Sequence, residues 1–122
     1  MNDQPVVSID NAEHYTWGEH CDGYHLVKTA ALSVIQERVP VGCHEVRHLH
    51  RYAEQFFHVL SGVATLEVDG IRYRLNPGQG LHVPAGVPHQ LGNEETQDLE
   101  FVVTSTPPSH GDRIEMPLEA PE

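Results

Sequence analysis

Turn-forming residues divide this sequence into short β-type runs from about residue 26 onward, and this pattern constrains the fold more than any other feature. Residues 63–68 and 71–75 flank Asp69-Gly70, which tolerates the positive φ angles of a type I′ turn, so they are predicted to form a hairpin. Further strands are predicted at residues 30–39, 46–50, 55–60, 81–83, 89–91 and 99–104. No stretch of ten or more residues has a sustained apolar period of 3.6, so little or no helix is expected. The pattern predicts an all-β sandwich or barrel.

The length of 122 residues suits one domain with a single core. Residues 1–29 are polar and mixed, and they are expected to form an N-terminal arm or edge strands. Residues 30–105 carry the strand pattern and are expected to form the barrel. Residues 106–122 are rich in proline and acidic side chains, and they are expected to form a C-terminal covering tail.

The charge balance argues against several classes of partner. Seven Lys and Arg against 18 Asp and Glu give a formal charge of −11, so no basic surface is available to neutralise phosphates. Neither a nucleic acid nor a membrane is therefore expected as a partner. No run approaches the ~20 apolar residues of a membrane span, and residues 1–10 lack the features of a secretory signal. Cys21 and Cys43 are interpreted as free thiols of a reducing compartment, which predicts a cytoplasmic location.

Histidine is unusually frequent, with 10 among 122 residues. His48 and His50 are separated by one residue within a predicted strand, so both side chains leave the same face. This arrangement allows one strand to supply two imidazoles to a single ion. The pair alone is equally typical of the polar face of an alternating strand, so its surroundings decide the interpretation.

Two sets of regularly spaced residues contain these histidines and a third one. The first set, with five, one, four and six residues between successive members, is Gly42, His48, His50, Gln55 and Gly62. The second set, with five, one, two and three residues between its members, is Gly78, Pro84, Gly86, His89 and Asn93. Together they resemble the paired motifs of the cupin family, over about residues 30–105, as in a small single-domain cupin. The second set matches throughout, whereas in the first Gln55 occupies the position where a metal-binding glutamate is usual.

The resemblance implies an antiparallel jelly-roll β-barrel whose mouth holds one divalent transition metal. Its ligands would be His48, His50, His89 and the residue at the glutamate position. The chemistry agrees, because imidazoles that converge in an apolar barrel are costly to bury unless a metal binds their nitrogens. The ion could be iron, manganese, nickel, zinc or copper. A carboxylate ligand would shift the preference towards iron.

Either Gln55 or Glu54 could be the fourth ligand of the metal. If Gln55 points into the barrel, Phe57 does so too and Glu54 points out, but a bulge after His50 would reverse this phase. A neutral amide leaves the charge of a divalent ion uncompensated by protein. We therefore expect the open positions to take an anionic, chelating small molecule, such as a carboxylate or an enolate. When it is not bound to the metal, Gln55 would orient substrate or water.

Other residues are candidates for supporting roles. His44 shares the alternation phase of His48 and would serve as a proton shuttle or general base, unless the strand is irregular there. Glu54 is the other candidate general base. Asp112 and Arg113 form either a surface ion pair or a lid contact over the barrel mouth. A homodimer is also expected, because small cupins commonly resemble dimers and open sheet edges need covering. The candidate contacts of that dimer are Trp17, Val34 and Ile35.

The family resemblance does not choose a reaction, because cupins host many chemistries. The first hypothesis is a metalloenzyme that acts on a small organic molecule, either by activating dioxygen or by Lewis-acid lyase or isomerase chemistry. The alternative is a module that binds or senses a small ligand without turnover. A general base in the pocket would favour the enzyme, whereas a metal with four ligands and no open position would favour the module.

Overall fold

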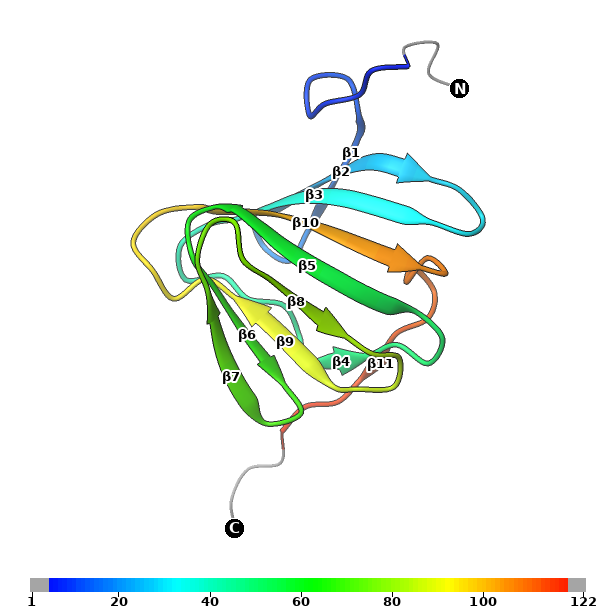
Figure 1. Cartoon of the computed structure of the whole chain (residues 1–122). Coiled ribbons are helices and arrows are strands. Elements are labelled where there is room, and N and C mark those ends of the chain that lie inside the picture. The colour runs from blue at the N-terminus through cyan, green and yellow to red at the C-terminus, as the bar shows by residue number, and fades with distance from the viewer. Residues whose placement is uncertain (1–4, 119–122) are drawn as a thin grey trace.

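The computed structural model describes residues 5–118, which form two antiparallel β-sheets and contain no helix. In Figure 1 the six-stranded sheet lies above the five-stranded sheet. The first has the strand order β1-β2-β3-β10-β5-β8 and the second the order β11-β4-β9-β6-β7. The predicted all-β, antiparallel fold is confirmed.

The strands are short, and each sheet draws them from distant parts of the chain. The six-stranded sheet contains β1 (Glu13–Trp17), β2 (Cys21–Lys28), β3 (Ser33–Val39), β10 (Leu99–Thr106), β5 (Glu54–Ser61) and β8 (Gly80–Val83). The five-stranded sheet contains β11 (Ile114–Glu115), β4 (His48–Leu49), β9 (His89–Gly92), β6 (Ala64–Val68) and β7 (Ile71–Leu75).

Alternation along β5 decides which of its side chains enter the barrel. Gln55, Phe57 and Val59 are buried, whereas Glu54 and Phe56 are exposed, as the two-residue period of a strand requires. The Gln55 side chain therefore points into the barrel, which is the direction predicted from strand alternation. The inward side chains of both sheets form one core, made of Cys21, Ile35, Val39, Phe57, Val59, Ala64, Leu66, Leu75, Val83, Leu91, Leu99, Phe101 and Val103.

The hairpin of β6 and β7 forms at the predicted residues. Val68 pairs with Ile71, and the two residues between them have positive φ angles of 51° at Asp69 and 89° at Gly70. These are the conformations that a type I′ turn requires. The Asp-Gly prediction is confirmed.

The N-terminal strands extend the barrel sheet, and they correct one prediction. Ile35 is 3% exposed and belongs to the core, so it is not available as a dimer contact, and its assignment was wrong. Trp17 and Val34 are half-buried, and their part in a dimer stays a prediction. The reason is alternation, since Ile35 belongs to the inward face of β3. Tyr15 on β1 covers Gly23 on β2, where an added Cβ would lie 2.3 Å from the tyrosine ring. Only glycine allows this close approach.

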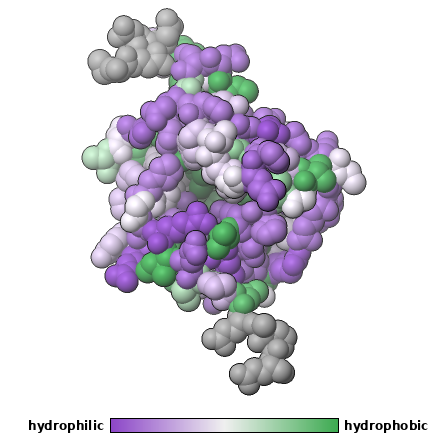
Figure 2. All heavy atoms as spheres, turned by 180° about the vertical axis from the view of Figure 1, so that it is seen from behind, coloured by the Kyte–Doolittle hydropathy of each residue, from purple (hydrophilic) through white to green (hydrophobic). Residues whose placement is uncertain are grey.

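The surface of the described residues is mainly hydrophilic on the face that Figure 2 shows. Hydrophobic side chains are scattered there among hydrophilic ones and do not form one continuous patch. Within residues 5–118, the structure has no helix with the length and apolar character needed to cross a membrane.

Candidate metal centre

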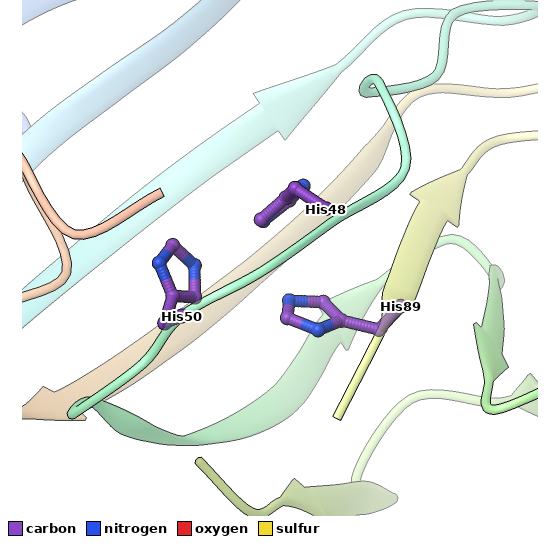
Figure 3. A group of neighbouring side chains, drawn as sticks. All are labelled: His48, His50 and His89. Carbon is purple, nitrogen blue, oxygen red and sulfur yellow. The ribbon is translucent and has the colours of Figure 1, made fainter. Parts of the chain in front are cut away.

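Three histidines from two separate parts of the chain meet inside the barrel (Figure 3). His48 begins β4 and pairs in register with His89, which begins β9, while His50 directly follows β4. All three are buried, and each offers a ring nitrogen within 4.8 Å of those of the other two. Their rings surround a common space, and together they could hold a metal ion.

Each imidazole is oriented by a backbone carbonyl. The Nδ1 hydrogen bonds run from His48 to Val46 at 2.6 Å, from His50 to Asp112 at 2.5 Å, and from His89 to Val87 at 3.0 Å. A carbonyl oxygen only accepts, so Nδ1 carries the hydrogen and the lone pair of Nε2 stays free. Nε2 of His89 is buried without a hydrogen-bond partner among the described residues, which is costly unless another group binds it.

Burial also keeps these rings uncharged. It lowers the pKa of His48 to about 3 and that of His89 to about 4, and it lowers the pKa of His50 as well. A metal binds neutral imidazole, so at neutral pH no proton has to be displaced from these nitrogens. The orientation, the burial and the free Nε2 lone pairs all fit a divalent ion with nitrogen ligands.

Gln55 lies beside this cluster with one end of its amide free. Its Nε2 donates to Oγ of Ser105 on β10 at 3.0 Å, while its Oε1 is buried without a partner among the described residues. An amide oxygen is a metal ligand or a hydrogen-bond acceptor for a bound molecule. Gln55 lines the same cavity as two of the histidines, His48 and His50.

A cavity of about 280 Å³ opens onto the histidine cluster. Its walls combine aromatic, aliphatic, acidic and basic side chains. The lining residues are Tyr15, Trp17, Ile35, Glu37, Glu45, His48, His50, Gln55, Phe57, Val103, Ser109, His110, Gly111 and Arg113. Small-molecule sites usually combine apolar walls with convergent polar groups, and this cavity contains both, with more polar groups than is usual.

The C-terminal tail forms one side of this cavity, and Asp112 holds it in place. The Asp112 carboxylate accepts backbone N–H groups of Arg51 and Tyr52 at 2.8 Å and of Ala53 at 3.0 Å. Arg113 lies at the mouth of the cavity and donates to the carbonyl of Val46 at 3.1 Å. Of the two interpretations left open for this pair of residues, the structure therefore favours the contact over the barrel mouth.

The sequence profile of the Cupin domain family matches residues 35–105. The chain belongs to the cupin family. An uncharacterized protein of Methanocaldococcus jannaschii is 27% identical over 89 residues, which are 72% of this chain and 71% of that protein. Quercetin 2,3-dioxygenase of Bacillus subtilis is 41% identical over 56 residues, which are 46% of this chain but 17% of that enzyme. The structure of KdgF from Halomonas sp. superposes with a TM-score of 0.76 at 20% identity, covering 84% of this chain and 94% of that one.

In this cupin, sequence reasoning missed two carboxyl groups that line the cavity. Burial raises the pKa of Glu37 to about 8 and that of Glu45 to about 7. Glu37 was detectable, because it lies two residues after Ile35 and shares its inward face on β3. Glu45 was not, because residues 44–47 do not form a regular strand and alternation does not apply to them.

His44 and Glu54, the two predicted general bases, lie outside the cavity of this cupin. His44 is exposed on another surface, where its backbone pairs with Gly92. The irregular segment before β4 breaks the alternation phase on which its prediction relied. Glu54 is exposed on the outer face of β5, and its Oε1 is hydrogen-bonded to Nε2 of His82 at 2.9 Å. The inward carboxyl groups are those of Glu37 and Glu45 instead.

Proposed function

We propose that this cupin is a metal-dependent enzyme that binds a small, anionic, oxygen-chelating molecule and transfers a proton on it, as Lewis-acid lyases and isomerases do. One observation carries the proposal. The cavity that His48 and His50 line also contains a carboxyl group, Glu37, and a guanidinium group, Arg113. Two of the clustered histidines, a carboxyl group and a guanidinium group therefore line the same small volume.

The metal would be held by His48, His50 and His89, with Gln55 beside them. When bound, a divalent ion supplies Lewis acidity, which stabilises negative charge on a substrate oxygen. Arg113 would pair with an anionic group of the substrate at the cavity mouth. The aromatic walls, Tyr15, Trp17 and Phe57, would exclude water and so strengthen these electrostatic contacts.

Glu37 would move the proton. Its raised pKa makes the deprotonated carboxylate a stronger base than an ordinary glutamate. It would take a proton from a carbon next to a carbonyl or carboxylate, and the electron pair left behind would move onto the neighbouring oxygen. Return of the proton to another carbon completes an isomerisation, whereas departure of a leaving group completes an elimination.

A second candidate is dioxygen chemistry, favoured by the 41% identity over 56 residues with the Bacillus subtilis quercetin dioxygenase. In that case the same histidines would hold the metal, and a chelating organic substrate would occupy the cavity. The two candidates differ in an easily measured way, because only the second consumes dioxygen.

Hydrogen–deuterium exchange tests the proton-transfer proposal. The metal-loaded protein is incubated in D₂O with a panel of α-keto and α-hydroxy carboxylates, and loss of carbon-bound hydrogen is followed by proton NMR. We expect exchange with at least one member, and Glu37→Gln should slow it by at least ~100-fold, because the general base is lost. Glu19→Gln, at an exposed position, is the matched control. Oxalate should still bind to Glu37→Gln if the site is intact.

Three results would contradict this proposal. Exchange that is unaffected by Glu37→Gln would remove Glu37 from the chemistry. Dioxygen consumption without exchange would select the dioxygenase. Oxalate binding without either activity across the panel would favour a module that binds its ligand without turnover.

A further inference from the structure

The metal ligands assigned so far carry no negative charge. His48, His50 and His89 are neutral imidazoles, and Gln55 is a neutral amide. A divalent ion held by these groups alone would keep its full charge inside a largely apolar barrel, which is electrostatically costly. A carboxylate within reach of the ion would reduce that cost, so the carboxyl groups of the cavity need to be considered as ligands.

Glu45 is a carboxyl group of the cavity that lies beside His48, one member of the cluster. Its Oε2 is 4.0 Å from Nε2 of His48, and its side chain is 16% exposed. Two atoms that bind the same ion at about 2.0–2.2 Å each can be at most ~4.4 Å apart. The separation of Glu45 from His48 falls within this limit. No Glu45 oxygen lies within 4.8 Å of the coordinating nitrogens of all three histidines, so the Glu45 side chain would have to shift towards the rest of the cluster when the ion binds.

The position of Glu45 is fixed by three hydrogen bonds to β9, the strand that carries His89. Oε1 of Glu45 accepts the backbone N–H of Leu91 at 2.9 Å, and the Glu45 backbone N–H donates to the Leu91 carbonyl at 3.0 Å. Nε2 of Gln90 donates to the Glu45 carbonyl at 2.9 Å. One carboxylate oxygen is thus used for anchoring, and the other is turned towards His48.

From this geometry we infer that Glu45 is a carboxylate ligand of the metal in this cupin, supplying from the segment before His48 the charge that Gln55 does not supply. The inference rests on the proposed metal-dependent function. It also refines the substrate class. With one ligand carboxylate the ion retains a single positive charge, and together with Arg113 this charge suits a small molecule with one or two anionic groups.

Metal selectivity tests the inference without any measurement of activity. Affinities for Mn²⁺ and Ni²⁺ are measured by calorimetry on the metal-free full chain, for the unmodified protein, Glu45→Gln and Glu54→Gln. We expect Glu45→Gln to weaken Mn²⁺ binding by at least ~10-fold and Ni²⁺ binding by clearly less, because manganese prefers oxygen ligands and nickel accepts imidazole well. Glu54→Gln removes an exposed carboxylate near the site and should change neither affinity.

A second variant tests whether the lost charge is the cause. Adding Gln55→Glu to Glu45→Gln returns a carboxylate to the cavity from a different strand and should restore most of the Mn²⁺ affinity. Equal weakening of Mn²⁺ and Ni²⁺ in Glu45→Gln, with no recovery in the double variant, would mean that Glu45 only positions β9, and the inference would be wrong.

Diffraction from zinc-loaded crystals of the unmodified protein gives an answer even if Glu45→Gln does not fold. A Glu45 oxygen at about 2.0–2.2 Å from the ion supports the inference, whereas one beyond ~3 Å overturns it. An ion bound by the histidines without Glu45 would leave the proposed function intact. Failure of the unmodified protein to bind any of the three ions would overturn the proposed function itself.

Discussion

Gln55 shows how one side chain sets the charge of this cavity. A glutamate and a glutamine occupy nearly the same volume, but only the glutamate brings a negative charge to an ion. The amide of Gln55 is buried and anchored to Ser105, and its oxygen has no hydrogen-bond partner within residues 5–118. The substitution therefore leaves room for an oxygen ligand while keeping the site more positive.

Gln55→Glu should consequently weaken the binding of anionic ligands. With the metal-loaded protein and oxalate as the probe, we expect the dissociation constant to rise by at least ~10-fold, because a second negative charge then faces the ligand across a short distance. Isothermal titration calorimetry measures this directly, and Glu54→Gln serves as a control outside the cavity. Unchanged or tighter oxalate binding would contradict the charge argument.

The spacing of the two motifs predicted the three clustered histidines, but it could not predict the carboxyl groups. His48 and His50 lie on one strand at a separation that alternation makes meaningful, and His89 follows a fixed pattern of glycine and proline. Glu45 belongs to an irregular segment, so its direction depends on hydrogen bonds to β9 that no local pattern encodes. Glu37 could have been found if Ile35 had been assigned to the core.

The C-terminal tail does more than cover the barrel, because it pairs with a strand and holds a loop and a histidine in place. β11 pairs with β4, bringing Ile114 opposite Leu49, and Asp112 binds three consecutive backbone N–H groups between β4 and β5. The carbonyl of Asp112 also accepts the Nδ1 hydrogen of His50. The tail therefore orients one of the clustered imidazoles from 62 residues away in the chain.

Asp112→Ala should loosen this contact without disturbing the core. We expect the amides of Arg51, Tyr52 and Ala53 to exchange with deuterium at least ~10-fold faster, because they lose their acceptor. Metal affinity should fall by about 10-fold, because the loosened tail no longer holds the backbone carbonyl of residue 112 in a fixed position against His50. Mass spectrometry and calorimetry measure the two effects, and Asp10→Ala is a control at an exposed turn. Unaltered exchange at residues 51–53 would show that the anchoring is not due to this carboxylate.

The sequence pattern predicted the β6–β7 hairpin, but it did not predict β1, β2 or the pairing of β11. The β6–β7 hairpin followed from the Asp-Gly turn and the alternating residues on each side of it. β1 and β2 gave no clear signal, because polar and small residues such as Gly23 and His25 occupy their inward positions. Pairing of β11 with β4 depends on contacts between residues distant in the chain, which local periodicity does not report.

In the whole molecule, the two sheets meet around one core, and the cavity is lined by side chains from both sheets. His48 and His89 come from the five-stranded sheet, whereas Gln55 and Glu37 come from the six-stranded sheet. A ligand that contacts residues from both sheets binds the folded chain and not the unfolded one. Such binding adds directly to the stability of the fold.

Metal should therefore raise the free energy of unfolding. With free Ni²⁺ at 100 times its dissociation constant, we expect an increase of about 2.7 kcal/mol in urea denaturation. His48→Ala should abolish most of this increment, whatever its effect on the metal-free protein, and His20→Ala, at an exposed position, should retain it. An increment of the same size in His48→Ala would place the stabilising ion elsewhere.

The hydrogen bond from His50 to the Asp112 carbonyl makes the ion and the tail thermodynamically linked. If docking of the tail improves metal affinity by a given factor, occupation of the metal site must improve docking of the tail by the same factor. The tail also forms one wall of the cavity, so the same reciprocity extends to the organic ligand that the cavity encloses. Binding of the metal would thus order the tail that forms one wall of the cavity before the organic ligand binds. Conversely, cleavage of the tail, or its binding to another molecule, would lower the affinity of the site for the metal.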